Sequence, residues 1–193
     1  MLRRFAICFL LMGFISVACA QDVWDLARTT LNGKRVAIEY GRPKLNGRTL
    51  ASLMTQLPPD RIWRAGAGPV TVLTTETDLL IGGKRVPAGS YSLYMHCPEK
   101  GDYSLVLNRD LGELSGTVLE KAASDRSNRP YPHFMDYTMG IGDKEVVRIP
   151  LKPLSSKRNE ILIYNFEPSG SGALLTISWG DQSWTAEFQP AAQ

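Results

Sequence analysis

The chain has 193 residues, of which 22 are Lys or Arg and 19 are Asp or Glu, so its formal net charge at pH 7 is +3. Without Arg3 and Arg4, which lie in the leader described below, 20 basic residues face 19 acidic ones. A chain this close to neutrality lacks the electric field that attracts nucleic acid or an anionic membrane surface, and we expect neither as a partner.

The first twenty residues have the layout of a secretory signal peptide. Arg3 and Arg4 precede an almost wholly apolar run over residues 5–17, which ends in the small residues Ala18-Cys19-Ala20. This pattern predicts cleavage after Ala20 and a secreted or periplasmic protein. The run is too short for a confident membrane span, which needs about 20 apolar residues, so we expect no spanning segment.

Ser16-Val17-Ala18-Cys19 offers an alternative interpretation of the same leader. It loosely resembles a bacterial lipoprotein box, in which Cys19 would carry a lipid anchor that tethers the domain to a membrane surface. A leucine-like residue is usual at the position of Ser16, which favours plain secretion. Cys97 is the one cysteine outside the leader, so no intramolecular disulfide can form in the predicted mature chain.

The chain after Ala20 is long enough for one domain with a substantial core. We expect a lead-in segment over residues 21–33, with a short helical piece over 22–30, followed by a single β-rich domain over 34–190. From residue 35 onward apolar and polar side chains alternate with period two, which is typical of strands with one buried face. This alternation predicts strands at 35–40, 70–77, 79–81, 84–86, 91–96, 103–107, 146–151, 160–166, 173–179 and 183–188.

Turn and helix signals complete the expected chain path. Gly82-Gly83 predicts a tight hairpin, because both residues can adopt positive φ. Residues 49–57 predict one short helix that ends at Pro58-Pro59. Residues 112–123 are ambiguous, and we expect a long surface loop over 124–137. Short strands joined by turns predict an all-β, mostly antiparallel fold: a β-sandwich or flattened barrel with one or two short helices.

Signals for catalysis and for metal binding are weak. His96 and His133 are the two histidines, and a metal site needs three or four ligands, so we expect no metal and no cofactor. Cys97 cannot easily form a dyad with His96, because neighbours on a strand point to opposite faces. An envelope hydrolase that uses one histidine and a carboxylate is an alternative. Glu76 and Asp78 would share a strand face, as a glycosidase pair could, but such pairs are more often solvated.

A basic and aromatic set near the start of the domain is the better candidate site. Arg42, Arg48 and Arg64 lie on the connections around the predicted helix, where their forked donors could bind a carboxylate or phosphate. Tyr40 and Trp63 could supply stacking faces for a ligand. Two residues of the following strands, Tyr94 and Asn108, are possible additions.

A structural role for the same residues is the competing hypothesis. Arg42 and Arg64 could pair with Glu39 or Asp60, or donate to loop carbonyls. Trp63 could close the end of the sandwich.

The motifs that carry these residues resemble the domain of unknown function 2911 family. The resemblance rests on 40–43, 47–48 and 63–67, and then on 81–84, 87–94 and 106–108, in the same order and spacing over roughly residues 34–108. It implies an exported bacterial β-rich domain and no established activity.

The chain also departs from the family pattern. That pattern tends to carry Thr and Asn where this chain has Ala65 and Gly68, so a polar site of the family would be reduced here. The aromatic residue usual after the Gly-Arg pair is replaced by Leu50-Ala51, and the segment over 112–142 is longer than the usual connection.

These observations predict a non-catalytic exported domain that binds a small polar or anionic ligand or an envelope protein. The envelope hydrolase and a purely structural envelope domain remain the alternatives.

Overall fold

The computed structural model describes residues 23–114, 130–131 and 137–192. Its elements in chain order are β1 (Val23–Leu31), β2 (Lys34–Arg42), α1 (Leu50–Met54), β3 (Ile62–Trp63), β4 (Val72–Thr75), β5 (Leu79–Ile81), β6 (Lys84–Val86), β7 (Gly89–His96), β8 (Ser104–Asn108), β9 (Glu113–Leu114), β10 (Pro130–Tyr131), α3 (Tyr137–Gly140), a 3-10 turn (Gly142–Lys144), β11 (Glu145–Pro150), β12 (Lys152–Leu154), β13 (Asn159–Ser169), β14 (Gly172–Gly180) and β15 (Gln182–Pro190).

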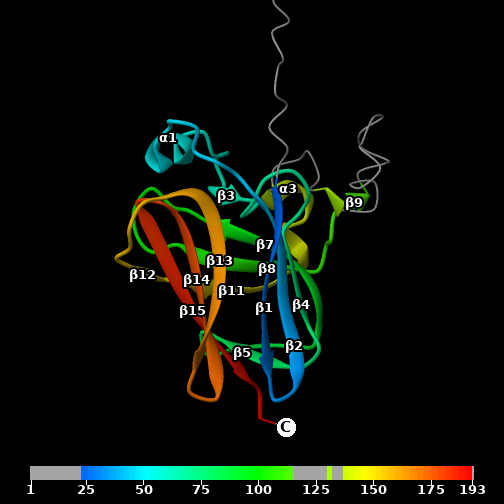
Figure 1. The fold of residues 1–193 in the computed structure, drawn as a ribbon. Coiled ribbons are helices and arrows are strands. Elements are labelled where there is room, and N and C mark those ends of the chain that lie inside the picture. Colours follow the sequence, from blue (N-terminus) through cyan, green and yellow to red (C-terminus); the bar gives the residue numbers. More distant parts are fainter. Residues whose placement is uncertain (1–22, 115–129, 132–136, 193) are drawn as a thin grey trace, which may run out of the picture.

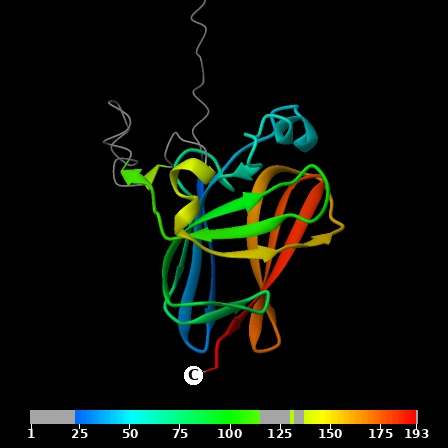
Figure 2. The same cartoon turned by 180° about the vertical axis from the view of Figure 1, so that it is seen from behind.

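Two antiparallel sheets form a sandwich (Figure 1), which confirms the predicted fold class. The first sheet has the order β1-β2-β4-β7-β8-β11, with β3 paired to β7. The second has the order β13-β14-β15-β5-β6, with β12 paired to β15, and β9 and β10 form a separate ribbon. The short helices α1 and α3 lie at one end of the sandwich, as the reverse view in Figure 2 also shows. No helix formed by the described residues is long and apolar enough to cross a membrane.

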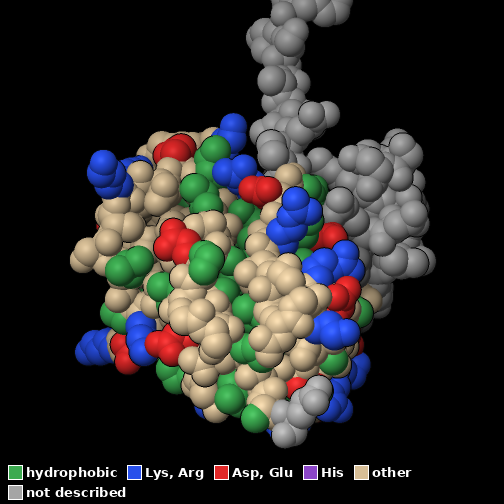
Figure 3. All heavy atoms as spheres, turned by 60° about the horizontal axis from the view of Figure 1, so that its bottom comes forward, with side chains coloured by type: hydrophobic (Ala, Val, Ile, Leu, Met, Phe, Trp, Pro, Cys, Tyr) green, Lys and Arg blue, Asp and Glu red, His purple; other side chains and the backbone are tan. Residues whose placement is uncertain are grey.

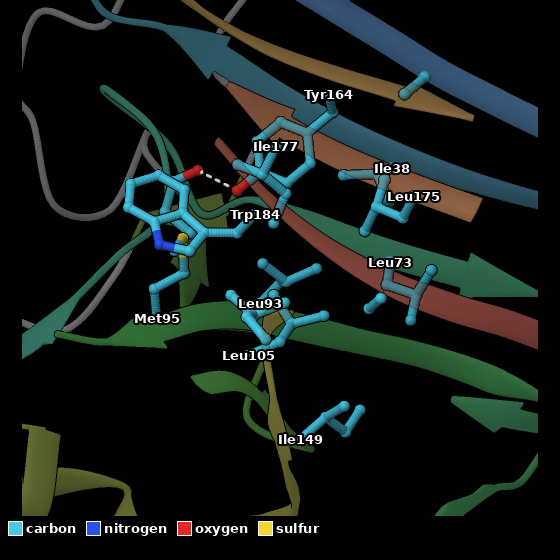
Figure 4. Packing of buried hydrophobic residues seen from close by; sticks show 14 of the residues in the cluster. Ile38, Leu73, Leu93, Met95, Leu105, Ile149, Tyr164, Leu175, Ile177 and Trp184 are labelled. Atoms are coloured by element: carbon cyan, nitrogen blue, oxygen red, sulfur yellow. Dashed lines mark hydrogen bonds between the residues drawn. The ribbon is translucent and has the colours of Figure 1, made fainter. Parts of the chain in front are cut away.

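The core lies between the sheets. Ile38, Leu73 and Leu93 come from the first sheet, Leu175 and Ile177 come from the second, and all five are fully buried (Figure 4). Side chains along each strand point alternately to the two faces, and burial follows this period over part of β2 and over β4, whereas β7 is buried on both faces from Tyr91 to Met95.

The chain also connects the two sheets along their sides. Leu151 separates β11 of the first sheet from β12 of the second. Just after β2, Lys44 makes an isolated antiparallel bridge to Ile161, and the Leu45 N–H donates to the Glu160 carbonyl at 2.9 Å. These links give the sandwich part of the character of a flattened barrel.

The expected helical piece over residues 22–30 is wrong. This segment is β1, which pairs with β2 in register from Val23 to Leu31. Ala27 and Leu31 are buried in the core, which is the period-two burial of a strand. Asn32 and Gly33 form the turn with φ of 50° and 76°, the conformation that a two-residue hairpin requires.

The predicted helix and the predicted glycine hairpin are confirmed. Within the predicted range 49–57, α1 covers Leu50–Met54, and the Thr49 hydroxyl caps it by accepting from the Ser52 N–H at 3.1 Å. Gly82 and Gly83 join β5 to β6 with φ of 54° and 80°. The expected loop over 124–137 and the ambiguous segment over 112–123 lie largely outside the described residues.

Charged side chains of both signs are interspersed on the face that Figure 3 shows. Glu76 and Asp78 follow β4 rather than sharing a strand. Each contacts an arginine, Glu76 with Arg35 at 3.5 Å and Asp78 with Arg85 at 2.7 Å. These carboxylates therefore belong to surface ion pairs, which contribute little to stability.

Candidate functional site

A cleft of about 370 Å³ lies beside α1 at the end of the sandwich that carries the short helices. Its lining includes Arg48, Leu53, Leu57, Trp63, Arg64 and Trp179, and we call it the α1–β3 cleft. This volume is in the range of sites for small molecules. The described residues that line it include two arginines and no aspartate or glutamate, so the cleft favours an anion.

Three of the seven predicted site residues meet in this cleft: Arg48, Trp63 and Arg64. Arg48 precedes α1, whereas Trp63 and Arg64 lie at the end of the short strand β3. The pairing of Trp63 with Met95 attaches β3 to β7 and so fixes one wall of the cleft to the first sheet. The structure thus brings these three residues to one cleft, and their role as a ligand site stays a prediction.

Trp63 stacks on Trp179 of β14. The ring centroids are 5.1 Å apart and the planes differ by 15°. Trp179 is 4% exposed and its Nε1–H is buried without a hydrogen-bond partner in the described part of the chain. Trp63 is half-buried, so one face of its indole rests on Trp179 while the remaining surface contributes to the cleft.

The two arginines of the cleft differ in how their donors are used. Arg48 Nε donates to the Leu45 carbonyl at 2.8 Å and its Nη2 donates to the Lys44 carbonyl at 3.3 Å. Arg64 is exposed, and within the described ranges its guanidinium makes no hydrogen bond or ion pair. Arg48 is therefore held against the backbone, whereas Arg64 offers a complete fork of donors.

Asp60, one of the two carboxylates expected as structural partners for Arg42 and Arg64, has other partners. Its Oδ1 accepts from the Ile62 N–H at 3.1 Å, and its Oδ2 accepts from the Thr138 N–H at 3.1 Å. Asp60 thus fixes the start of β3 and contacts α3 instead of neutralising Arg64.

Strained backbone lies on both sides of the segment 62–64, which comprises β3 and Arg64. Arg61 and Ala65 have φ of 56° and 54°, a region that costs a residue with a side chain about 1 kcal/mol or more. The Ala65 carbonyl accepts from Thr71 Oγ1 at 3.1 Å and from Tyr164 Oη at 2.8 Å, and these buried bonds hold the turn. Backbone held in this way is concentrated at functional sites in proteins.

A family model described as "Protein of unknown function (DUF2911)" matches residues 24–188, which is most of the chain. The chain belongs to this family. The resemblance carried by its glycine, arginine and aromatic motifs is thereby confirmed. No curated protein and no solved structure matches the chain, so a function has to be argued from the residues of the cleft.

Two other predicted site residues of this DUF2911 domain, Tyr40 and Arg42, lie outside the cleft lining. Tyr40 is fully buried; its hydroxyl donates to Asp25 Oδ2 at 3.3 Å and accepts from the Tyr164 N–H at 3.1 Å. Arg42 pairs with Asp25 at 3.2 Å, on β1. Arg42 therefore connects β2 to β1, and Tyr40 connects both strands to Tyr164 of β13.

Tyr94 and Asn108 belong to a small second core beneath α3 of the DUF2911 domain. The Tyr94 ring lies 4.8 Å from the Tyr137 ring at 63°. Asn108 is fully buried, and its Nδ2 donates to Tyr137 Oη at 2.9 Å and to the Ile141 carbonyl at 2.7 Å. Burial raises the pKa of Tyr94 to about 12, so its phenol stays neutral.

The described residues of the DUF2911 domain offer the hydrolase hypothesis no catalytic pair. Partial burial and the positive charge of the nearby Arg148 both lower the pKa of His96. His96 has no hydrogen bond to a described carboxylate or hydroxyl. Glu145, the carboxylate of the same surface, is held by Arg148 through bonds of 3.1 and 2.9 Å. His133 lies outside the described residues. No group of three or more His, Cys, Asp or Glu in the described ranges could hold a metal ion.

Sequence reasoning missed Trp179, Leu53 and Leu57 as parts of the site. Leu53 and Leu57 lie four residues apart, as on one side of a helix, and this spacing does not distinguish a core face from a cleft wall. Both are half-buried, pack against the core and line the cleft. Trp179 was placed correctly in a strand, but no local signal relates it to Trp63, which lies on the other sheet.

Proposed function

We propose that this DUF2911 domain is an exported, non-catalytic binding domain whose ligand is a small organic anion held in the α1–β3 cleft. The observation that carries the proposal is that Arg64, whose guanidinium makes no hydrogen bond or ion pair within the described ranges, lines a cleft of aromatic and aliphatic side chains with no described carboxylate. The leader over residues 1–20 supports export.

The chemistry of the lining supports an anion with an apolar body. Arg64 supplies charge-assisted hydrogen bonds, and Arg48, fixed by the Leu45 carbonyl, adds a second positive charge. Leu53, Leu57 and Trp63 supply apolar surface that a ligand would remove from water. Trp179 adds a buried N–H without a described partner, and such a group normally costs about 1–3 kcal/mol.

The decisive variant is Arg64→Ala, and the probe is octanoate, which combines one carboxylate with an apolar chain. We expect the unmodified protein to bind octanoate in isothermal titration calorimetry. Removing Arg64 should weaken binding by about tenfold or more, because a hydrogen bond to a charged group contributes about 1.5–3 kcal/mol.

Arg28→Ala is the matched control, since Arg28 is an exposed arginine on β1 that does not line the cleft. It should leave octanoate binding unchanged. Equal affinities for the two variants, or no binding of octanoate and of the aromatic carboxylate used below, would refute the cleft as an anion site.

A further inference from the structure

We infer that the ligand of the α1–β3 cleft is a monocarboxylate with a flat ring, stacked on Trp63 with its carboxylate on Arg64. The inference rests on the proposed function and adds the chemical class of the ligand. The stacking geometry, the side chains of the cleft walls and the number of unbonded arginine nitrogens in the described lining support this ligand class.

The tryptophan pair provides a preformed stacking surface. Trp179 is almost fully buried in β14, and Trp63 lies nearly parallel to it at a centroid distance of 5.1 Å. Aromatic rings at such distances gain about 0.5–1.5 kcal/mol beyond the burial of area. A flat ligand ring on the cleft side of Trp63 would extend the stack by one layer. Because the stack and the pairing with Met95 already orient Trp63, little side-chain freedom is lost on binding.

The side chains of the cleft walls favour a ligand whose uncharged part is apolar. Leu53 and Leu57 of the α1 region face the cleft together with Met54, and all three are aliphatic. Aliphatic walls opposite an indole face favour an apolar ring over a polyhydroxylated one, because buried hydroxyl groups need hydrogen-bond partners. Gln56 is the one uncharged polar side chain that the described lining offers.

The arginine nitrogens that make no hydrogen bond in the described lining favour a carboxylate over a phosphate as the anionic group of the ligand. Arg48 has two of its three nitrogens bonded to the Lys44 and Leu45 carbonyls, which leaves Nη1. In the described lining, Arg64 therefore has the one guanidinium with no hydrogen bond at any of its nitrogens. A guanidinium can bind one planar carboxylate through two parallel hydrogen bonds. A phosphate dianion has more charge and more acceptor oxygens, and the described lining contains no lysine to meet them.

The test compares four probes by calorimetry on the purified protein: 2-naphthoate, octanoate, 2-naphthamide and inorganic phosphate. We expect 2-naphthoate to bind most tightly, because it alone combines the flat ring with a carboxylate. The neutral 2-naphthamide should bind about tenfold more weakly or worse, since it lacks the charge that Arg64 pairs with.

The variants separate ring stacking from simple apolar contact. Trp63→Leu should weaken 2-naphthoate about five- to tenfold and change octanoate by about twofold at most, because leucine keeps apolar area without a flat face. Trp63→Phe keeps a ring and should retain most of the 2-naphthoate affinity. Retained octanoate binding shows that each variant is folded.

The outcomes are distinguishable. If octanoate binds through Arg64 but 2-naphthoate binds no better, or if Trp63→Leu retains octanoate binding and weakens 2-naphthoate by no more than it weakens octanoate, the flat-ring class is wrong and the proposed function stands. If inorganic phosphate displaces 2-naphthoate at a concentration lower than that of the 2-naphthoate, the assignment of a carboxylate as the anionic group of the ligand is wrong. If neither octanoate nor 2-naphthoate binds, the proposed function fails and this inference fails with it.

Discussion

Hydrogen-bond partners separate the arginines and tyrosines of this domain into two groups. Arg42 pairs with Asp25, and the Tyr40 hydroxyl bonds to Asp25 and to the backbone of Tyr164, so these polar groups stabilise the fold. Arg64 has no such described partner and lies beside a cleft. Arg42 also has a donor without a described partner, its Nε, but that atom is buried. At the scale of single residues, an exposed guanidinium with unbonded donors in a cleft lining therefore distinguishes a candidate ligand contact from a residue that stabilises the fold.

Buried acids predict an alkaline limit to stability. Burial raises the pKa of Cys97 and of Tyr94 to about 12 each, and it raises the pKa of Tyr164 as well. Below about pH 8 these groups are neutral in both states, so their ionisation leaves the free energy of unfolding unchanged. As the pH rises from about 9 toward 12, the unfolded chain loses protons that the native state retains, so the free energy of unfolding falls.

Urea denaturation at about pH 8 and about pH 10.5 measures this fall, to which Cys97 alone should contribute about 2 kcal/mol. Cys97→Ala should show a smaller fall, because only the tyrosines then titrate. Equal stability of the unmodified protein at both pH values would contradict the prediction.

At the scale of elements, the hairpin of β1 and β2 forms one edge of the first sheet. Its turn requires positive φ at both Asn32 and Gly33. This turn sets the antiparallel pairing of β1 with β2, which extends over the full length of β1. Gly41 near the end of β2 has no room for a side chain, because a Cβ would overlap the Ala67 carbonyl oxygen. The hairpin is therefore packed against the loop that follows Arg64, and two motifs far apart in the sequence lie in contact.

Asn32→Ala should destabilise the protein by about 1 kcal/mol, because alanine pays the full steric cost of the left-handed region that asparagine tolerates. Asn32→Gly should be close to neutral. The midpoint of urea denaturation measures both. An Asn32→Ala midpoint no lower than that of Asn32→Gly would show that the turn does not control the stability of the hairpin.

At the scale of the whole molecule, the sandwich concentrates its irregular structure at one end. The helices α1 and α3 and the short strand β3 lie there, whereas the hairpin of β1 and β2 turns at the other end (Figure 1). Regular strands leave few backbone groups free for a ligand, so a site at the end of the sheets is the arrangement that the fold favours. The DUF2911 match from residue 24 to 188 covers both sheets.

The proposed export of the domain predicts a defined N-terminus. Protein recovered after export from a bacterial host should have lost residues 1–20 and begin at Gln21, because Ala18 and Ala20 fit the small-residue rule of signal peptidase. Intact-mass measurement tests this directly. A mass that corresponds to an acylated Cys19 would instead establish lipid anchoring, and an uncleaved chain would refute the leader.

Local chemistry made much of the architecture predictable. Period-two alternation located the main strands, Gly82-Gly83 located a hairpin, and Thr49 with Pro58-Pro59 bounded the helix. The segment over 22–30 was mispredicted although Asn32-Gly33 is a strong hairpin signal. Its alternation is interrupted by charged residues, and a strand at the edge of a sheet needs fewer apolar positions than a central one.

The sequence by itself determined that the chain forms pleated layers and that arginines and aromatic rings crowd the connections around one helix, because these properties depend on near neighbours. Only the tertiary structure decided which of them share a site. It placed Trp179 of one sheet under Trp63 of the other and used the polar groups of Tyr40 and Asn108 in the interior. Among the described residues it left the Arg64 guanidinium without a hydrogen-bond partner. The physical reason is that hydrogen-bond satisfaction and stacking depend on distances between segments that the sheets bring together, and no local pattern encodes those distances.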